Sequence, residues 1–170
     1  MRRTAFRTLR SALPVVLVTG ALGIALYAYF QSFGSGLMDR VTGWTALSAA
    51  FPLQLLGAGV EVRGTIVASD RFAYNIVAKC TLVGPLLLYV ASVLAYPAGL
   101  ASKASGVPLG LLAIGGLNLV RLVSLFYVGT YAPQYLDVAH LIVWQGVMVL
   151  SVVMLWLYWV QRASRRARAA

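Results

Sequence analysis

Residues 107–129, VPLGLLAIGGLNLVRLVSLFYVG, form an apolar run with a single charged side chain, that of Arg121. A transmembrane helix needs about 20 mostly apolar residues, so this run is long enough to cross a bilayer. The whole chain has the same character, with 61% hydrophobic residues, 11% charged residues and a mean hydropathy of +0.84. Soluble domains carry about 25% charged residues. This composition predicts an all-α polytopic membrane protein.

Three more runs reach a similar length, so we predict four transmembrane helices, at about residues 12–30, 81–100, 107–129 and 138–160. The first follows the basic stretch MRRTAFRTLR, as a signal peptide would, but its apolar run is too long and no small-residue cleavage site follows it. We therefore expect an uncleaved anchor. Because the spans take up most of the length, residues 1–170 are predicted to form a single integral membrane domain.

Residues 43–60 are a fifth candidate span, and whether they cross decides the sidedness of every later segment. With four spans, nine Lys and Arg residues face the cytoplasm and four lie outside, whereas five spans give seven and six. The positive-inside rule favours four spans. Both termini and the tail 161–170 are then cytoplasmic, and residues 31–79 lie on the outer face of the inner (plasma) membrane.

The outer-face segment has two local features. Trp44 and Phe51 suit a helix that lies in the membrane interface, and Pro52 makes the same stretch a poor span. The sequence VEVRGTIV, residues 60–67, alternates apolar and polar residues around an Arg-Gly pair, which is typical of a short β-hairpin. We therefore predict an interfacial helix followed by a hairpin.

The net charge of +10 is compatible with nucleic-acid binding. However, the basic residues cluster at the two ends of the chain, beside apolar runs, and membrane topology accounts for that distribution better. The predicted partner is therefore the lipid bilayer, and no nucleic acid is expected.

Three chemically capable residues share one predicted depth. Cys80, the only cysteine, opens the second span, and His140, the only histidine, lies in the first turn of the fourth. Arg121 lies eight residues before Gly129, about 12 Å below the outer end of its helix, and its long side chain can rise toward the surface. A charge within a span costs at least about 2.5 kcal/mol, which makes Arg121 a functional candidate.

Each of the three also has a structural interpretation. A lone cysteine is commonly a small buried apolar side chain, and a histidine at a helix start can sit among lipid headgroups. Arg121 can donate hydrogen bonds to neighbouring carbonyls or to Asn118, one turn below. The shared depth favours a common function over three separate structural roles.

The chemistry that suits this trio is nucleophilic catalysis, in which a thiolate attacks a carbonyl, a histidine moves the proton and a cation stabilises the oxyanion. Lys79 either favours the thiolate of the adjacent cysteine or points into the headgroups. Asp137, three residues before His140, either caps the fourth helix or orients the imidazole. One His, one Cys and four acidic residues show no ligand spacing, so neither a metal site nor a cofactor is predicted.

The order of these residues resembles the exosortase and archaeosortase family. A cysteine opens one span, NLVR (residues 118–121) matches an Asn-x-x-Arg element in the next, and a histidine opens the span after that. The short length is similar to the compact H-type members, and the resemblance runs from about Val60 to Gly146. Family members are understood as membrane-embedded cysteine transpeptidases. They recognise exported proteins by a C-terminal tail with a short motif, one transmembrane helix and a basic end, cut near the motif and pass the new C-terminus to an acceptor.

The resemblance implies that Cys80 is the nucleophile and that Arg121 and His140 are the family arginine and histidine, with Asn118 in the same motif. It leaves open which of the two acts as base and which stabilises the oxyanion. The family cysteine is usually followed by Ser or Thr and then Gly, whereas here Thr81 precedes Leu82. That departure removes a backbone freedom next to the nucleophile.

Two other classes of function compete with this one. A membrane thiol oxidoreductase normally needs a pair of exchanging cysteines, which this chain lacks. A non-enzymatic membrane scaffold would use Arg121, Asn118 and His140 only to hold helices together. Three glycines of the third span permit close helix approach, either to a substrate helix or within the protein: Gly110, Gly115 and Gly116.

Overall fold

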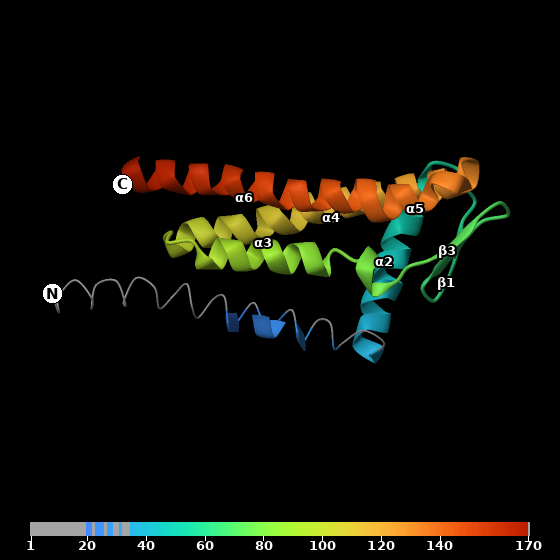
Figure 1. Cartoon of the computed structure of the whole chain (residues 1–170), viewed down its shortest axis with the longest axis horizontal. Helices are drawn as coiled ribbons and strands as arrows, with labels where there is room; N and C mark the ends of the chain where they lie inside the picture. Colours follow the sequence, from blue (N-terminus) through green and yellow to red (C-terminus); the bar gives the residue numbers. More distant parts are fainter. Residues whose placement is uncertain (1–19, 22, 26, 29–30, 32–34, 170) are drawn as a thin grey trace.

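The computed structural model describes residues 20–21, 23–25, 27–28, 31 and 35–169, and most of them are helical. The predicted first span, 12–30, lies largely outside the described residues. In chain order the elements are α2 (Gly36–Leu55), β1 (Glu61–Arg63), β2 (Ile66–Ala68), β3 (Ala73–Asn75), a 3-10 turn (Ala78–Cys80), α3 (Val83–Ala95), α4 (Leu100–Tyr131), a second 3-10 turn (Pro133–Tyr135), α5 (Leu136–Val138), a π-helical turn (Ala139–Val143) and α6 (Trp144–Ala169). Helices α3, α4 and α6 pack side by side, and α2 and the strands lie at one end of this bundle (Figure 1).

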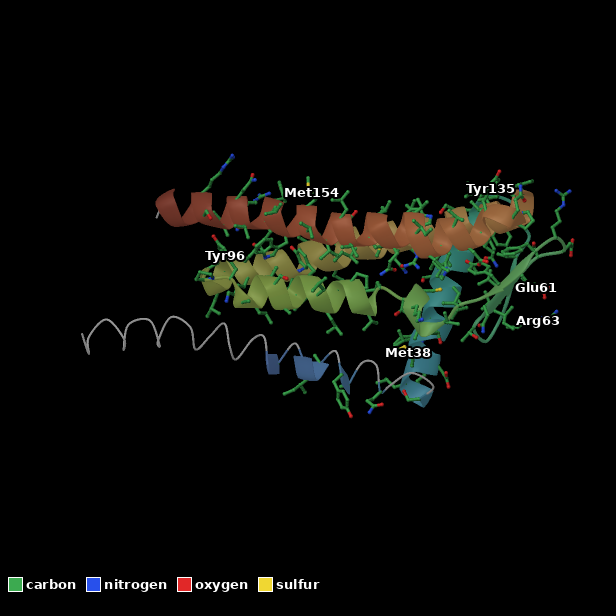
Figure 2. The ribbon with its side chains drawn as sticks, viewed as in Figure 1. Met38, Glu61, Arg63, Tyr96, Tyr135 and Met154 are labelled. Atoms are coloured by element: carbon green, nitrogen blue, oxygen red, sulfur yellow. The ribbon has the colours of Figure 1, made fainter. Side chains whose placement is uncertain are left out.

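Two of the described helical stretches, Leu100–Tyr131 and Pro133–Arg166, are long and apolar enough to cross a membrane. They contain the third and fourth predicted spans. Helix α6 also presents a long apolar surface away from the bundle, formed by Val147, Val149, Leu150, Val153, Met154 and Leu157. Figure 2 shows Met154 on this outward side. Soluble monomers rarely expose continuous apolar surfaces of this kind, so a hydrocarbon environment suits it.

The predicted span 81–100 is wrong in its extent, and the structure does not show four spans. Helix α3 has 13 residues, so it is about 20 Å long, shorter than the roughly 30 Å hydrocarbon core of a bilayer. It ends at Ala95 because Pro97 disfavours the helical conformation of the residue before it, and Tyr96 is already extended at φ −70° and ψ 136°.

Helix α4 starts earlier than the sequence predicts. It begins at Leu100 after a four-residue turn, so Lys103 lies in its first turn and not in a loop. The Lys103 ammonium donates a 2.7 Å hydrogen bond to the carbonyl of Leu94, near the end of α3. A cation there satisfies one of the carbonyls that a helix end leaves open.

A helix is present where the sequence predicts one before the hairpin: α2 runs across the end of the bundle and not along it (Figure 1). It is not among the described helices long and apolar enough to span. One side is buried against the rest of the protein and consists mainly of small residues: Thr42, Thr45, Ala46, Ala49 and Ala50. The opposite side exposes large apolar residues: Leu37, Trp44, Leu47, Phe51 and Leu55.

The predicted hairpin is confirmed, but the all-α prediction is incomplete because a third strand joins it. Strands β1 and β2 pair antiparallel across a two-residue loop whose first position, Gly64, has φ 64°. Glycine takes that conformation without a steric cost, which suits a tight hairpin. Strand β3 then pairs with β2 to complete a three-stranded sheet. Figure 2 shows Glu61 and Arg63, joined by a 3.0 Å ion pair, at the outer edge of this sheet.

In the interior of the bundle, aromatic rings pack against glycines. A β-carbon added at Gly110 would overlap the ring of Tyr89, and one at Gly106 would overlap Trp159. Tyr89 is fully buried, and its hydroxyl donates a 3.2 Å hydrogen bond to the carbonyl of Gly106. Gly110 therefore serves packing within the protein, whereas nothing lies within 4 Å of an added β-carbon at Gly116.

We predict that Gly110→Ala lowers the melting temperature of the purified protein in detergent and that Gly116→Ala does not. Both substitutions improve helix propensity by about 0.5–1 kcal/mol. Only Gly110→Ala places a methyl group against the ring of Tyr89, which burial and its hydrogen bond keep in position. Overpacking of this kind costs about 1–3 kcal/mol. Equal melting temperatures for the two variants would contradict the described contact between α3 and α4.

Candidate active site

Cys80 is held in a short turn between the sheet and α3. The turn starts at Ala78, three residues after the end of β3, and the backbone N–H of Cys80 donates to the carbonyl of Val77 at 2.8 Å. The Thr81 hydroxyl donates to the carbonyl of Ala78 at 2.8 Å and closes the turn. The cysteine is 6% exposed, so its thiol lies within the core formed by α2, the sheet and α4.

Asn118 fixes the height of this turn relative to α4. Its side-chain Nδ2 donates a 3.1 Å hydrogen bond to the backbone carbonyl of Cys80, and the asparagine is 2% exposed. A buried amide that holds a buried carbonyl is costly to disrupt, because either partner alone would be left without a hydrogen bond. The bond places the backbone of Cys80 next to the Asn-x-x-Arg element of α4.

His140 meets the cysteine from the other long helical stretch. Its Nε2 lies 3.6 Å from the Sγ of Cys80, a distance that suits a hydrogen bond to sulfur in either direction. The histidine belongs to a π-helical turn, Ala139–Val143, inserted before α6. Such turns are rare and frequently occur at functional sites, because the wider turn redirects the side chains that follow it.

Arg121 is buried at the same level, with 2% of its surface exposed. Its Nε has no hydrogen-bond partner among the described residues, and the ion pair found among them joins two other residues on the sheet. Arg121 lies three residues after Asn118, whose amide binds the Cys80 carbonyl, so one helical turn separates the arginine from that contact. The prediction that the Arg121 side chain rises to the surface is wrong, because this side chain is buried within the protein.

Lys79 and Asp137 lie at the margin of this group. Both are exposed, and no hydrogen bond joins either side chain to a described residue. Their opposite charges both act on His140. The capping role predicted for Asp137 is wrong, because this residue lies inside the first turn of α5 and the start of α5 has no side-chain cap.

The family pattern has a glycine two residues after the cysteine, where this chain has Leu82, and this difference causes no backbone strain. Leu82 adopts φ −74° and ψ −8°, an ordinary right-handed helical conformation that any residue can take. A glycine is therefore not required two residues after the cysteine in this chain.

Sequence reasoning missed Tyr74, which reaches the site from β3. Its hydroxyl donates to the carbonyl of Leu122 at 3.4 Å, and its ring packs against Phe126. Burial raises the pKa of Tyr74, and the negative charge of an ionised Cys80 raises it further. The missing signal was the strand itself, because a three-residue strand is too short to predict from alternation and the chain contains nine tyrosines.

Two hollows lie outside this group. One, of about 310 Å³, lies beside the sheet and is lined by Gly57, Ala58, Gly59, Ser69, Asp70, Arg71, Phe126, Tyr127, Thr130 and Tyr131. The other, of about 340 Å³, is an apolar depression between α4 and α6. Neither is lined by Cys80. Within the described part of the chain, no three His, Cys, Asp or Glu side chains are grouped to hold a metal ion.

Comparison with family models, with characterised proteins and with solved structures found no match to this chain. The arrangement itself therefore carries the functional argument. It groups a thiol, an imidazole within hydrogen-bond distance of it and a buried arginine that pairs with no carboxylate in the described part of the chain, each from a different element. This set can ionise a nucleophile, transfer a proton and stabilise a developing negative charge.

Proposed function

We propose that this chain is a membrane-embedded, exosortase-like cysteine peptidase or transpeptidase. It cleaves the C-terminal sorting tail of exported proteins at the outer face of the membrane and transfers the new C-terminus to an acceptor. The observation that carries this proposal is the 3.6 Å contact between Cys80 and His140 beside the buried Arg121. The family resemblance of the sequence supports the same activity.

Acylation starts when Sγ of Cys80 attacks the carbonyl carbon of the scissile bond and the thiol proton passes to Nε2 of His140. The carbonyl electron pair moves to oxygen, where Arg121 stabilises the negative charge. Collapse of this intermediate breaks the C–N bond, and His140 returns the proton to the departing amine. The products are a thioester on Cys80 and the released tail.

Deacylation repeats the sequence with a second nucleophile. The acceptor, or water, attacks the thioester carbonyl and gives its proton to His140. The C–S bond then breaks, and the Cys80 thiolate takes the proton back from the imidazolium. No atom is consumed beyond the incoming nucleophile, so the step needs no cofactor.

The proposed topology retains four spans, with α3 as a short second span and the first span within residues 12–30. Two features support it: α2 lies across the bundle and exposes Trp44 and Phe51, and the C-terminus lies at the end of the bundle remote from the sheet (Figure 1). The basic residues at that end, Arg162, Arg165 and Arg166, then face the cytoplasm. The sheet and the active site face outward in the inner membrane.

This placement suits a substrate that is anchored in the same bilayer. An exported protein held by one C-terminal helix presents its juxtamembrane peptide bond at the outer end of the bundle. Because both partners share one membrane, their effective concentration is high and little affinity for a diffusing peptide is needed. The basic end of the tail would remain on the cytoplasmic side.

The competing proposal is a membrane scaffold in which the polar residues are structural. The hydrogen bond from Asn118 to the Cys80 carbonyl is favourable to that reading, because it joins α4 to the turn. A scaffold, however, needs only the cysteine backbone, so loss of the thiol would be harmless. The two proposals therefore differ in whether the Cys80 thiol is required for function.

The topology predicts which introduced cysteines are accessible in intact spheroplasts. Cys80→Ser removes the only cysteine, and Asp70→Cys or Ala101→Cys can then be added at exposed positions near the sheet or at the start of α4. A membrane-impermeant maleimide should label Asp70→Cys in intact spheroplasts and Ala101→Cys only after lysis. The reverse pattern would overturn the proposed sidedness.

The enzyme proposal predicts that Cys80→Ala and Cys80→Ser abolish processing of an exported protein that carries a C-terminal tail of the tripartite kind. His140→Ala should slow it by about 10²–10⁴-fold, as expected when a general base is lost. Arg121→Ala should slow it by about 10²–10³-fold, as expected for an oxyanion donor. Processing is followed by the size of the exported protein on blots.

The control for these variants is the amount of each protein in the membrane fraction and its melting temperature. Unchanged processing by a stable Cys80→Ala protein would reject the enzyme proposal. If Arg121→Ala and His140→Ala instead prevent the protein from folding while Cys80→Ala is harmless, the scaffold is the better account.

A further inference from the structure

We propose that the hydroxyl of Tyr74 is a second oxyanion donor at the Cys80 site, acting together with Arg121. This inference rests on the proposed acyl-transfer function and adds a residue to it. It assigns a purpose to the small sheet, which is to bring that hydroxyl over the nucleophile.

The sheet directs Tyr74 inward. Within β3 the residues on either side, Ala73 and Asn75, are exposed and Tyr74 is partly buried. Tyr74 pairs with Val67 of β2, which is fully buried, so both side chains lie on the face of the sheet that packs on the core. The tyrosine thus joins the same apolar cluster as Cys80.

The backbone N–H groups of Cys80 and Thr81 and the amide of Asn118 are already used. The backbone N–H groups of Cys80 and Thr81 donate within the turn, to the carbonyls of Val77 at 2.8 Å and Ala78 at 3.2 Å. The Asn118 amide is bound to the Cys80 carbonyl. Backbone amides commonly stabilise the oxyanion in acyl transfer, but those of Cys80 and Thr81 are engaged, which favours side-chain donors at this thiol.

Tyr74 is engaged only weakly. Its bond to the carbonyl of Leu122 is 3.4 Å long, whereas strong O–H···O bonds are about 2.7–2.8 Å. That carbonyl belongs to the interior of α4, where the N–H four residues later is its regular partner. The hydroxyl can therefore leave Leu122 for a stronger acceptor without leaving a carbonyl unpaired.

The hydroxyl is also at the right level and in the right state. Leu122 directly follows Arg121, so the hydroxyl meets α4 at the residue next to the arginine. Burial, with the added effect of Cys80, raises the pKa of Tyr74, so the phenol is neutral at pH 7. A neutral hydroxyl donates a hydrogen bond to an oxyanion and does not compete with it for Arg121.

The test compares two reactions of the purified full-length protein in detergent. In acylation by p-nitrophenyl acetate, Cys80 Sγ bonds to the acetyl carbon, the C–O bond breaks and p-nitrophenolate leaves, so an oxyanion forms on the way. In alkylation by iodoacetamide, the thiolate displaces iodide at a saturated carbon and no oxyanion forms. Only the first reaction needs an oxyanion donor.

Tyr74→Phe is expected to slow acylation about 10- to 100-fold and to leave both the alkylation rate and the melting temperature at wild-type values. Tyr127→Phe is the matched control, because this partly buried tyrosine packs in the same cluster and its hydroxyl donates to no described residue. It should react like the wild type in both assays.

Three outcomes would overturn the inference. Acylation at the wild-type rate by Tyr74→Phe would remove the hydroxyl from the reaction. A parallel loss of acylation, alkylation and melting temperature would make the tyrosine structural. If Cys80→Ala releases p-nitrophenolate as fast as the wild type, the thiol is not the nucleophile and the proposed function fails with it.

Discussion

The side chain of Arg121 is buried with no carboxylate paired to it among the described residues, and the arrangement of the end of the bundle beside the sheet follows from that constraint. An isolated cation in a low-dielectric interior is costly, and proteins keep one there when another charge compensates it. The turn that carries Cys80 is bound one helical turn away, through the hydrogen bond from Asn118 to the Cys80 carbonyl. A thiolate, or an oxyanion formed on the acyl group it attacks, would be the natural counter-charge.

Four elements supply the groups of this site. Helix α4 carries Arg121 and Asn118, the turn after the sheet carries Cys80, the π-helical turn carries His140 and β3 carries Tyr74. Helix α2 covers them from the end of the bundle with a face of small residues, which lets its backbone lie close to the turn. This cover shields the site from bulk water. Electrostatic stabilisation of a developing charge is stronger in such a low-dielectric environment than in water.

The sequence was most informative where a residue type is rare. A single cysteine, a single histidine and a single arginine within an apolar run could be placed at one level by counting residues, and the structure brings their side chains or turns together. The hairpin and a helix before it were also predicted from local patterns. The hairpin was indicated by an Arg-Gly pair between alternating residues, and the helix by aromatic residues beside a proline.

The remaining features depend on geometry that sequence patterns do not encode. A hydropathy window averages over about 20 residues and does not register a single proline. The predicted span 81–100 therefore ran through Pro97, from the helix α3 to the start of α4. The π-helical turn at His140 arises from packing and has no local signature. Tyr74 was hidden because its strand has three residues and is specified by pairing with β2, not by its own sequence.

The most direct test of the account is to look for the acyl-enzyme itself. The purified protein is mixed with an exported protein that carries a tripartite tail, in the absence of an acceptor, and quenched in acid for intact-mass analysis. The account predicts a covalent adduct on Cys80 with the mass of the N-terminal product, which hydroxylamine releases and which Cys80→Ala does not form. Cleavage of the substrate without such an adduct, or an adduct on any other residue, would contradict it.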